Sequence, residues 1–146
     1  MQWLKYILII DIGYNREKTF STLINPRSDW MLRFDYYIPT LRLVIEYDGS
    51  HHYRIISRKG ISKKQIEEEF YEMIQRDEEK DKWCSKNNVN LLRIPYTVRI
   101  SKIKQRITEY LATLEDHDTT TGPLIESPFR EERQKIIAEY LNRKTT

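Results

Sequence analysis

One stretch, Phe34–Gly49, constrains this chain more than any other segment. It reads FDYYIPTLRLVIEYDG and contains two runs rich in β-branched and aromatic residues, Phe34–Ile38 and Leu41–Asp48. Pro39 and Thr40 separate the runs, and a proline has no N–H to donate to a strand ladder, so it belongs in the turn. The stretch therefore predicts a β-hairpin.

This hairpin would bring three carboxylates together. Because side chains alternate along a strand, Val44, Glu46 and Asp48 share one face. A turn centred just after Thr40 places Asp35 opposite Glu46, with Cβ atoms roughly 4.5–5.5 Å apart. We expect this face to look outward and to contribute little to the core.

Converging carboxylates repel one another, so a positive charge is expected among them. Oxygen ligands of this kind suit a hard divalent cation such as Mg²⁺, and Mn²⁺ could replace it. The sequence therefore predicts a metal site formed by Asp35, Glu46 and Asp48. The alternative is that Asp35 and Asp48 are ordinary strand-end residues and that Glu46 faces solvent.

Composition predicts a globular protein rather than a membrane-spanning or disordered one. The chain has 146 residues, of which 32% are charged and 39% hydrophobic. A net charge of +3 permits nucleic-acid binding without requiring it. Cys84 is the only cysteine, which predicts a reducing, cytoplasmic setting with no disulfide framework.

Histidines and a basic run follow the hairpin directly. His52 lies close to the carboxylates, where it could activate water or protonate a leaving oxygen, although a lone histidine is more often structural. His51 ranks lower. A basic run beside an acidic site suits contacts with DNA phosphates, although such a run is often only a solvated loop. Its members are Arg54, Arg58, Lys59, Lys63 and Lys64.

A long helix is predicted next, with Ser62 as N-cap and an end near Asn87. At about 100° per residue, Asp77 and Lys80 fall within its apolar stripe of Ile66, Phe70, Met73 and Cys84. One interpretation is a simple ion pair at the rim of the core. The other is that this face looks onto the hairpin carboxylates.

The remaining segments predict a mixed sheet flanked by helices. Asn90–Tyr96 reads as a buried strand, parallel to the hairpin because a helix connects them. An amphipathic helix is predicted over Ser101–Leu114. We expect a core domain over residues 1–115, a linker-like loop over 116–126 and a C-terminal helix over 127–146 that packs on the core or on a partner, including a homodimer.

The ordered blocks FDYYIP, IEYDG, HY, RDxxK and LLRIPY resemble the PD-(D/E)xK nuclease superfamily. The most similar branch is that of the very-short-patch repair endonuclease and related phage homing endonucleases. The resemblance covers roughly residues 17–96. It implies a restriction-endonuclease-like α/β core, metal binding by Asp35 and Glu46, and a functional role for His52.

The chain departs from the superfamily pattern at three points. Asp48 occupies the position of the usual lysine, and the RDxxK match, Arg76, Asp77 and Lys80, offers Lys80 as the replacement. The single cysteine excludes the cysteine-based structural zinc site of the repair endonuclease. No acidic residue precedes Asp11, so the glutamate that relatives often carry on a first helix is missing, and the N-terminal segment 3–12 reads as helix or strand.

Two functions remain in competition at this point. The first is a metal-dependent DNA endonuclease of homing or mismatch- and site-specific nicking type, and the resemblance implies that its cleavage leaves a 5′-phosphate. Its expected catalytic residues are Asp35, Glu46, Asp48, His52, Asp77 and Lys80, with either Lys80 or His52 assisting proton transfer. Arg76 joins the basic run in contacting DNA. The second is a non-catalytic DNA-binding module that retains the fold.

Overall fold

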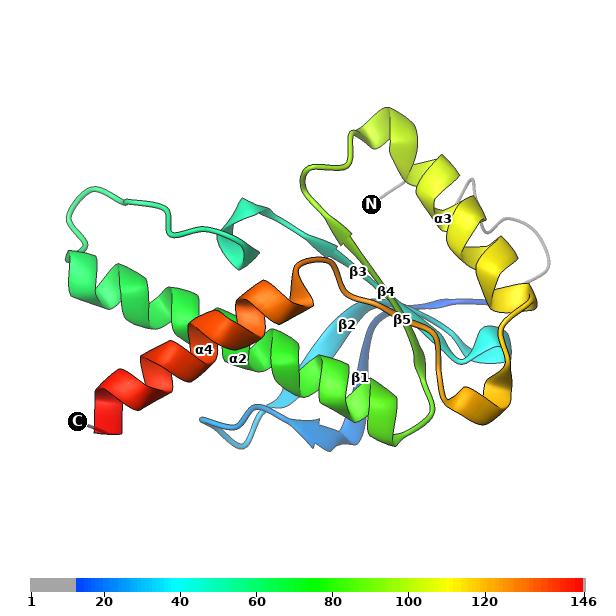
Figure 1. The fold of residues 1–146 in the computed structure, drawn as a ribbon, viewed down its shortest axis with the longest axis horizontal. Coiled ribbons are helices and arrows are strands. Elements are labelled where there is room, and N and C mark those ends of the chain that lie inside the picture. Colours follow the sequence, from blue (N-terminus) through cyan, green and yellow to red (C-terminus); the bar gives the residue numbers. More distant parts are fainter. Residues whose placement is uncertain (1–12, 146) are drawn as a thin grey trace.

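The computed structural model describes residues 13–145, and its centre is a mixed five-stranded sheet with the strands in chain order (Figure 1). The first three strands are antiparallel neighbours, whereas the last three are parallel. The strands are β1 (Asn15–Ile24), β2 (Met31–Ile38), β3 (Leu43–Asp48), β4 (Asn90–Pro95) and β5 (Ile125–Glu126). The prediction for segment 3–12 lies outside the described residues.

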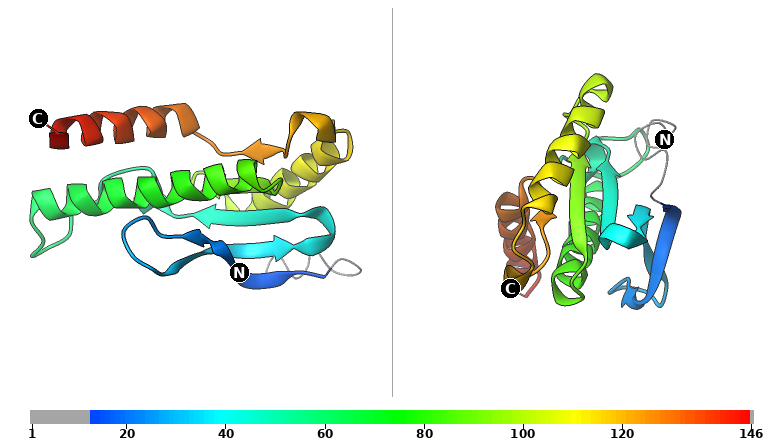
Figure 2. Two further views of the ribbon diagram at one scale, coloured as in Figure 1. Left: turned by 90° about the horizontal axis from the view of Figure 1, so that it is seen from below. Right: turned by 90° about the vertical axis from the view of Figure 1, so that its right-hand side faces the viewer.

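Helices flank this sheet, as the sequence predicts. The long helices are α2 (Lys63–Lys86), α3 (Ile100–Glu115) and α4 (Arg130–Thr145), and the short 3₁₀ turns are η1 (Pro39–Leu41), η2 (Ser50–His52) and η3 (Thr119–Thr121). Figure 2 shows α4 lying along α2 on the side away from the sheet. Among the described residues, no helix has the length and apolar character needed to cross a membrane.

The predicted hairpin is present in the predicted register. Tyr36 pairs with Ile45 and Ile38 pairs with Leu43, and the backbone pairing ends at Tyr36, one residue short of the predicted Asp35–Glu46 pair. The second strand begins two residues later than predicted. Pro39–Leu41 form a 3₁₀ turn, and Arg42 adopts a left-handed conformation with φ of 46° before β3 starts.

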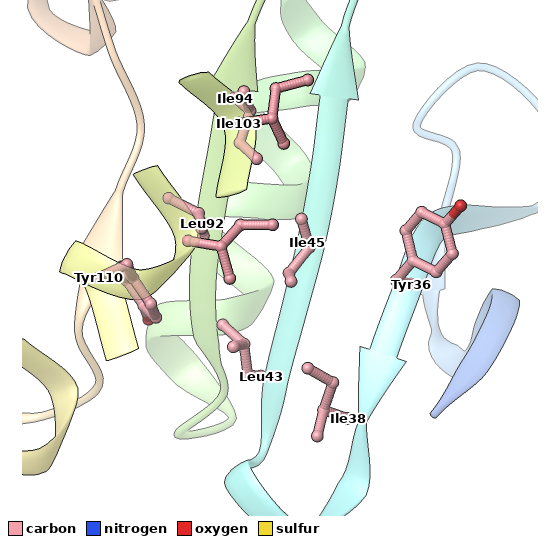
Figure 3. Close-up of a cluster of buried hydrophobic side chains, with 9 residues drawn as sticks. Tyr36, Ile38, Leu43, Ile45, Leu92, Ile94, Ile103 and Tyr110 are labelled. Atoms are coloured by element: carbon pink, nitrogen blue, oxygen red, sulfur yellow. The ribbon is translucent and has the colours of Figure 1, made fainter. Parts of the chain in front are cut away.

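The larger core lies between the sheet and α3 (Figure 3). Leu43 and Ile45 from β3 meet Leu92 and Ile94 from β4, and the fully or almost fully buried Ile103, Ile107 and Tyr110 of α3 cover them. The alternate residues of the same strands face α2, where Val44 and Leu91 pack against Cys84. Consequently Glu46, Asp48 and Arg93, which continue this second set, also face α2.

The helix α2 begins and ends as the sequence predicts. The Ser62 hydroxyl accepts a hydrogen bond from the Gln65 N–H at 3.1 Å, which is a standard N-cap. The last helical residue is Lys86, with Asn87 as the C-cap. The Arg42 guanidinium donates to the carbonyls of Asn87 and Asn88, which satisfies groups that a helix end leaves open.

The segment 116–126 differs from the linker-like loop that its composition predicts. It contains η3 and ends in β5, which pairs in parallel with β4 through Leu91–Ile125 and Leu92–Glu126. The Asn90 amide side chain accepts from the Leu124 N–H at 2.8 Å and fixes where β5 begins. The segment therefore adds an edge strand to the sheet and connects α3 to α4.

Of the two places predicted for the C-terminal helix, the structure shows the first: α4 packs on the same chain. Tyr140 stacks on Tyr71 with ring centroids 4.0 Å apart and joins Phe70 and Ile74 in a small apolar cluster. Its hydroxyl donates to Glu68.

Replacing Tyr140 with Ala should lower the free energy of unfolding by about 3 kcal/mol, because a large buried aromatic leaves a cavity against α2. Urea unfolding would measure the loss, and amide exchange should increase mainly in α4. Leu141→Ala is the matched control, since Leu141 is exposed one residue further along. Equal effects of the two changes would show that α4 does not depend on this contact.

Candidate functional site

The three hairpin carboxylates lie where β2 and β3 stop pairing through their backbones. The Asp35 N–H donates to Glu46 Oε1 at 3.0 Å, and the Tyr47 N–H donates to Asp35 Oδ2 at 2.7 Å. Each carboxylate thus replaces a carbonyl in the strand ladder. Phe34 and Tyr37 pack in the same apolar cluster, although they are three residues apart and the β1–β2 register is unbroken across them.

The expected outward orientation of these carboxylates is wrong. The Glu46 residue is only 4% exposed and Asp48 is fully buried, while Asp35 is half-buried. The alternative in which Glu46 faces solvent is also wrong. The reason is that α2 lies directly over this face of the sheet, so the carboxylates are enclosed between the strand and the helix.

Arg93 provides the positive charge at the centre of the cluster. It is the residue opposite Glu46 in the parallel β3–β4 register, and its side chain is fully buried. The guanidinium lies 2.9 Å from Asp48 Oδ2, 2.8 Å from Asp81 Oδ1 and 3.4 Å from Asp77 Oδ1. A buried arginine needs such partners, because an unpaired buried charge is very costly.

Sequence reasoning placed Arg93 in a buried strand but gave it no role. The available signal was its position inside the otherwise apolar run NLLRIPY. A charge in the middle of a buried strand predicts carboxylate partners, and the parallel register points it at Glu46.

Lys80 makes the contact that the sequence predicts. Its Nζ lies 3.1 Å from Glu46 Oε2, its side chain is only 12% exposed, and the ammonium also lies over the Phe34 ring. The predicted position of Asp77 beside it is confirmed as well, since Asp77 is buried and faces the same cluster. The face of α2 that carries both residues therefore looks onto the hairpin carboxylates.

His52 lies between two of the aspartates. Its Nδ1 is 2.7 Å from Asp77 Oδ2 and 3.6 Å from Asp48 Oδ1. Burial would raise the pKa of Asp77, but Arg93, His52 and Arg133 outweigh it and hold this pKa well below its usual range. Asp77 is therefore ionised and orients the His52 ring.

The start of α4 also reaches this cluster, which sequence reasoning missed. Arg133 is buried and donates to Asp77 Oδ2, and its guanidinium lies over the Tyr53 ring. The Tyr53 hydroxyl donates to Asp48 Oδ2 at 3.0 Å. No local pattern indicates that Arg133, more than 50 residues away from Asp77, would meet it.

Asp81 is a further buried carboxylate that was missed. It accepts from Arg93 and, at 2.6 Å, from the Ser127 hydroxyl at the entry to α4. Its signal was present, because Asp81 follows Asp77 by one helical turn on the same stripe.

The donors present fit a hard divalent cation. Asp48 Oδ1 is buried and has no hydrogen-bond partner within the described chain. Among the described residues, Asp48, His52 and Asp77 offer ligand atoms that all lie within 4.8 Å of one another, whereas the predicted set of Asp35, Glu46 and Asp48 forms no such group. The predicted set would offer oxygen alone, which suits Mg²⁺, whereas the group that the structure brings together adds an imidazole nitrogen.

The predicted DNA-binding residues lie in the segment after η2 and on α2. Those of the basic run are all exposed, and they are Arg54, Arg58, Lys59, Lys63 and Lys64. Arg58 pairs with Glu69, and Lys63 lies near Glu67, so part of this charge is already balanced. Arg76 is half-buried on α2, one residue before Asp77.

Comparison with known proteins gives viral relatives. The chain is similar to Uncharacterized protein 307L of Invertebrate iridescent virus 6, at 40% identity over 68 residues that cover 47% of this chain and 32% of the relative. It is also similar to Uncharacterized protein 033L of Invertebrate iridescent virus 3, at 35% identity over 56% of this chain and 40% of the relative. A third relative is Uncharacterized protein 094L of Frog virus 3, at 31% identity over 53% of this chain and 48% of the relative.

The chain therefore spans less than half the length of each of these three relatives. No protein-family profile matches it, and no solved structure does.

Replacing Arg93 with Met should lower the free energy of unfolding by about 3–5 kcal/mol, because Asp48, Asp77 and Asp81 would lose their shared buried counter-charge. The loss should be smaller near pH 5, where the unpaired carboxylates take up protons. Urea unfolding at both pH values measures this. A loss below about 1 kcal/mol would show that the carboxylates are satisfied without Arg93.

The stability of the metal-free protein should also depend on Glu46. Burial raises the pKa of Glu46 to about 7, against the opposing effect of Lys80 and Arg93. A carboxyl whose pKa is higher in the folded state than in the unfolded chain takes up its proton preferentially on folding. The contribution of Glu46 to the free energy of unfolding should therefore fall by about 3 kcal/mol as pH rises from about 4.5 through about 7.

Glu46→Gln removes this titration, because the carboxamide does not ionise and is close in size and shape to the carboxylate that it replaces. In EDTA, the difference in unfolding free energy between variant and wild type should shift by about 3 kcal/mol in favour of the variant over the same pH range. Parallel pH profiles of the two proteins would contradict the raised pKa.

Proposed function

We propose that this protein is a metal-dependent DNA endonuclease with a restriction-endonuclease-like core. The observation that carries the proposal is the buried Oδ1 of Asp48, which forms no hydrogen bond within the described residues and lies 3.6 Å from His52 Nδ1. It belongs to a carboxylate cluster in which Lys80 contacts Glu46. The arrangement of a hairpin, a crossover helix and a parallel strand around this point supports the proposed core.

In this proposal Asp35, Glu46 and Asp48 would hold Mg²⁺, with Mn²⁺ able to replace it. The ion would supply Lewis-acid polarisation of the scissile phosphodiester. Glu46 and Asp48 are rigid ligands, because Lys80 fixes one carboxylate and Arg93 and Tyr53 fix the other. Rigid ligands favour a defined coordination geometry.

Lys80 and His52 are the groups that would handle charge and protons. The Lys80 ammonium is held at Glu46, where it would stabilise negative charge that develops on the phosphate. The His52 ring is oriented by Asp77 and reaches toward Asp48, where it would accept or donate a proton. Either residue suits the proton-transfer role.

The basic run would bind the phosphates on both sides of the cut. Its exposed side chains offset the repulsion between the acidic cluster and DNA, and its contribution would be affinity rather than chemistry.

A non-catalytic DNA-binding module remains the second candidate, because hydrogen-bond donors of the protein already occupy several of the carboxylate oxygens that a metal would need. Both Glu46 oxygens accept hydrogen bonds. Arg133 donates to Asp77 Oδ2, the same oxygen that lies close to His52 Nδ1. In that case, the charged cluster would serve stability, and the protein would bind DNA without cutting it.

A cleavage assay with supercoiled plasmid separates the two candidates. The wild-type protein should cut with Mg²⁺ or Mn²⁺ and should be inactive in EDTA. Lys80→Met keeps the length of the stem and removes the charge, so the rate should fall by about two orders of magnitude while DNA affinity changes little. Lys82→Met on the exposed side of the same helix is the matched control.

Asp48→Asn extends the assay to the metal site. It should abolish cleavage and metal binding, whereas Asp116→Asn at an exposed position should leave both unchanged. Plasmid that is bound but stays uncut by the wild-type protein in every metal would support the non-catalytic module instead.

A further inference from the structure

A groove lies beside the candidate site, between α2 and the segment that follows η2. Its volume is about 440 Å³, within the range typical of small-molecule sites. Its apolar wall includes Ile55 and Ile56 from the segment and Phe70 and Met73 from α2. Ile55 and Ile56 are 44% and 39% exposed, so the wall is open to a ligand.

The groove lies next to the candidate site, because two of its lining residues directly precede residues of that site in the sequence. His51, which lines it, precedes His52, and the two rings are 4.5 Å apart between centroids. Arg76, on the opposite wall, precedes Asp77. A ligand seated in the groove would therefore be close to the carboxylate cluster.

Two arginines of the groove are available for an anion. The acidic lining residues Glu69 and Glu72 are paired with Arg58 and Arg27. In contrast, Arg76 contacts the Met73 sulfur and Arg54 lies over the Tyr96 ring, and neither forms an ion pair within residues 13–145. The groove thus combines an apolar wall with two uncompensated guanidinium groups.

We propose that this groove binds a single unpaired nucleotide of the DNA substrate, with its base on the isoleucine wall and its phosphate at Arg54 and Arg76. This inference rests on the proposed function, because the neighbouring site would act on the same strand. A nucleotide has the required pairing of an apolar face and an anion. A base inside a duplex is stacked on both faces, so only an unpaired or extruded base can enter.

The predicted consequence is a preference for DNA that carries an unpaired nucleotide. The protein is titrated in EDTA against three fluorescent probes: an intact duplex, the same duplex with one extra unpaired nucleotide, and a single strand. The duplex with the unpaired nucleotide should bind about 10-fold more tightly than the intact duplex.

Ile55→Ser/Ile56→Ser should remove this preference and leave affinity for the intact duplex unchanged. The matched control is Ile100→Ser, an isoleucine that is 77% exposed and lies outside the groove. Arg76→Gln is a second variant, which should weaken binding of the unpaired nucleotide without altering the isoleucine wall. Circular dichroism establishes that each variant is folded.

The outcomes separate this inference from the function on which it rests. Binding to all DNA without any preference, or a preference that the double isoleucine variant retains, overturns the groove as a nucleotide site and leaves the endonuclease proposal standing. Failure to bind any of the three probes overturns both.

Discussion

The buried guanidinium of Arg93 is the interaction on which the candidate site depends. It comes from the centre of β4 and meets carboxylates from β3 and from two successive turns of α2. Arg93 therefore does more than neutralise charge. It fixes α2 over one face of the sheet at the position where Lys80 reaches Glu46 and Asp77 reaches His52.

The site is close to electrically balanced without any bound ion. Five carboxylates, Asp35, Glu46, Asp48, Asp77 and Asp81, face the cations of Lys80, Arg93 and Arg133, with Arg130 at 3.9 Å from Asp81. Burial nevertheless raises the pKa of Glu46 and of Asp35, which indicates that their negative charge is only partly compensated. A divalent cation beside Glu46 and Asp48 would complete that compensation, and its binding would compete with the protons and cations already present.

Much of this arrangement follows from local rules. Alternation and turn chemistry predict the hairpin, its register and the shared face of Glu46 and Asp48, and helical periodicity predicts that Lys80 points inward. These rules relate residues that are near in sequence. They do not state how completely one element covers another, so the burial of the carboxylates was not predicted, although one interpretation placed the face of α2 over them. Contacts that α4 makes across the fold, such as Arg133 with Asp77, were equally inaccessible.

The location of a bound metal tests the central claim most directly, and diffraction from crystals soaked in Mn²⁺ would show it. The account predicts an anomalous peak within coordination distance of Asp48 Oδ1. Its other ligands would be Asp35 and Glu46, as proposed, or His52 and Asp77. Manganese bound only elsewhere on the protein, with Asp48 left without a metal at saturating concentration, would contradict the proposed site.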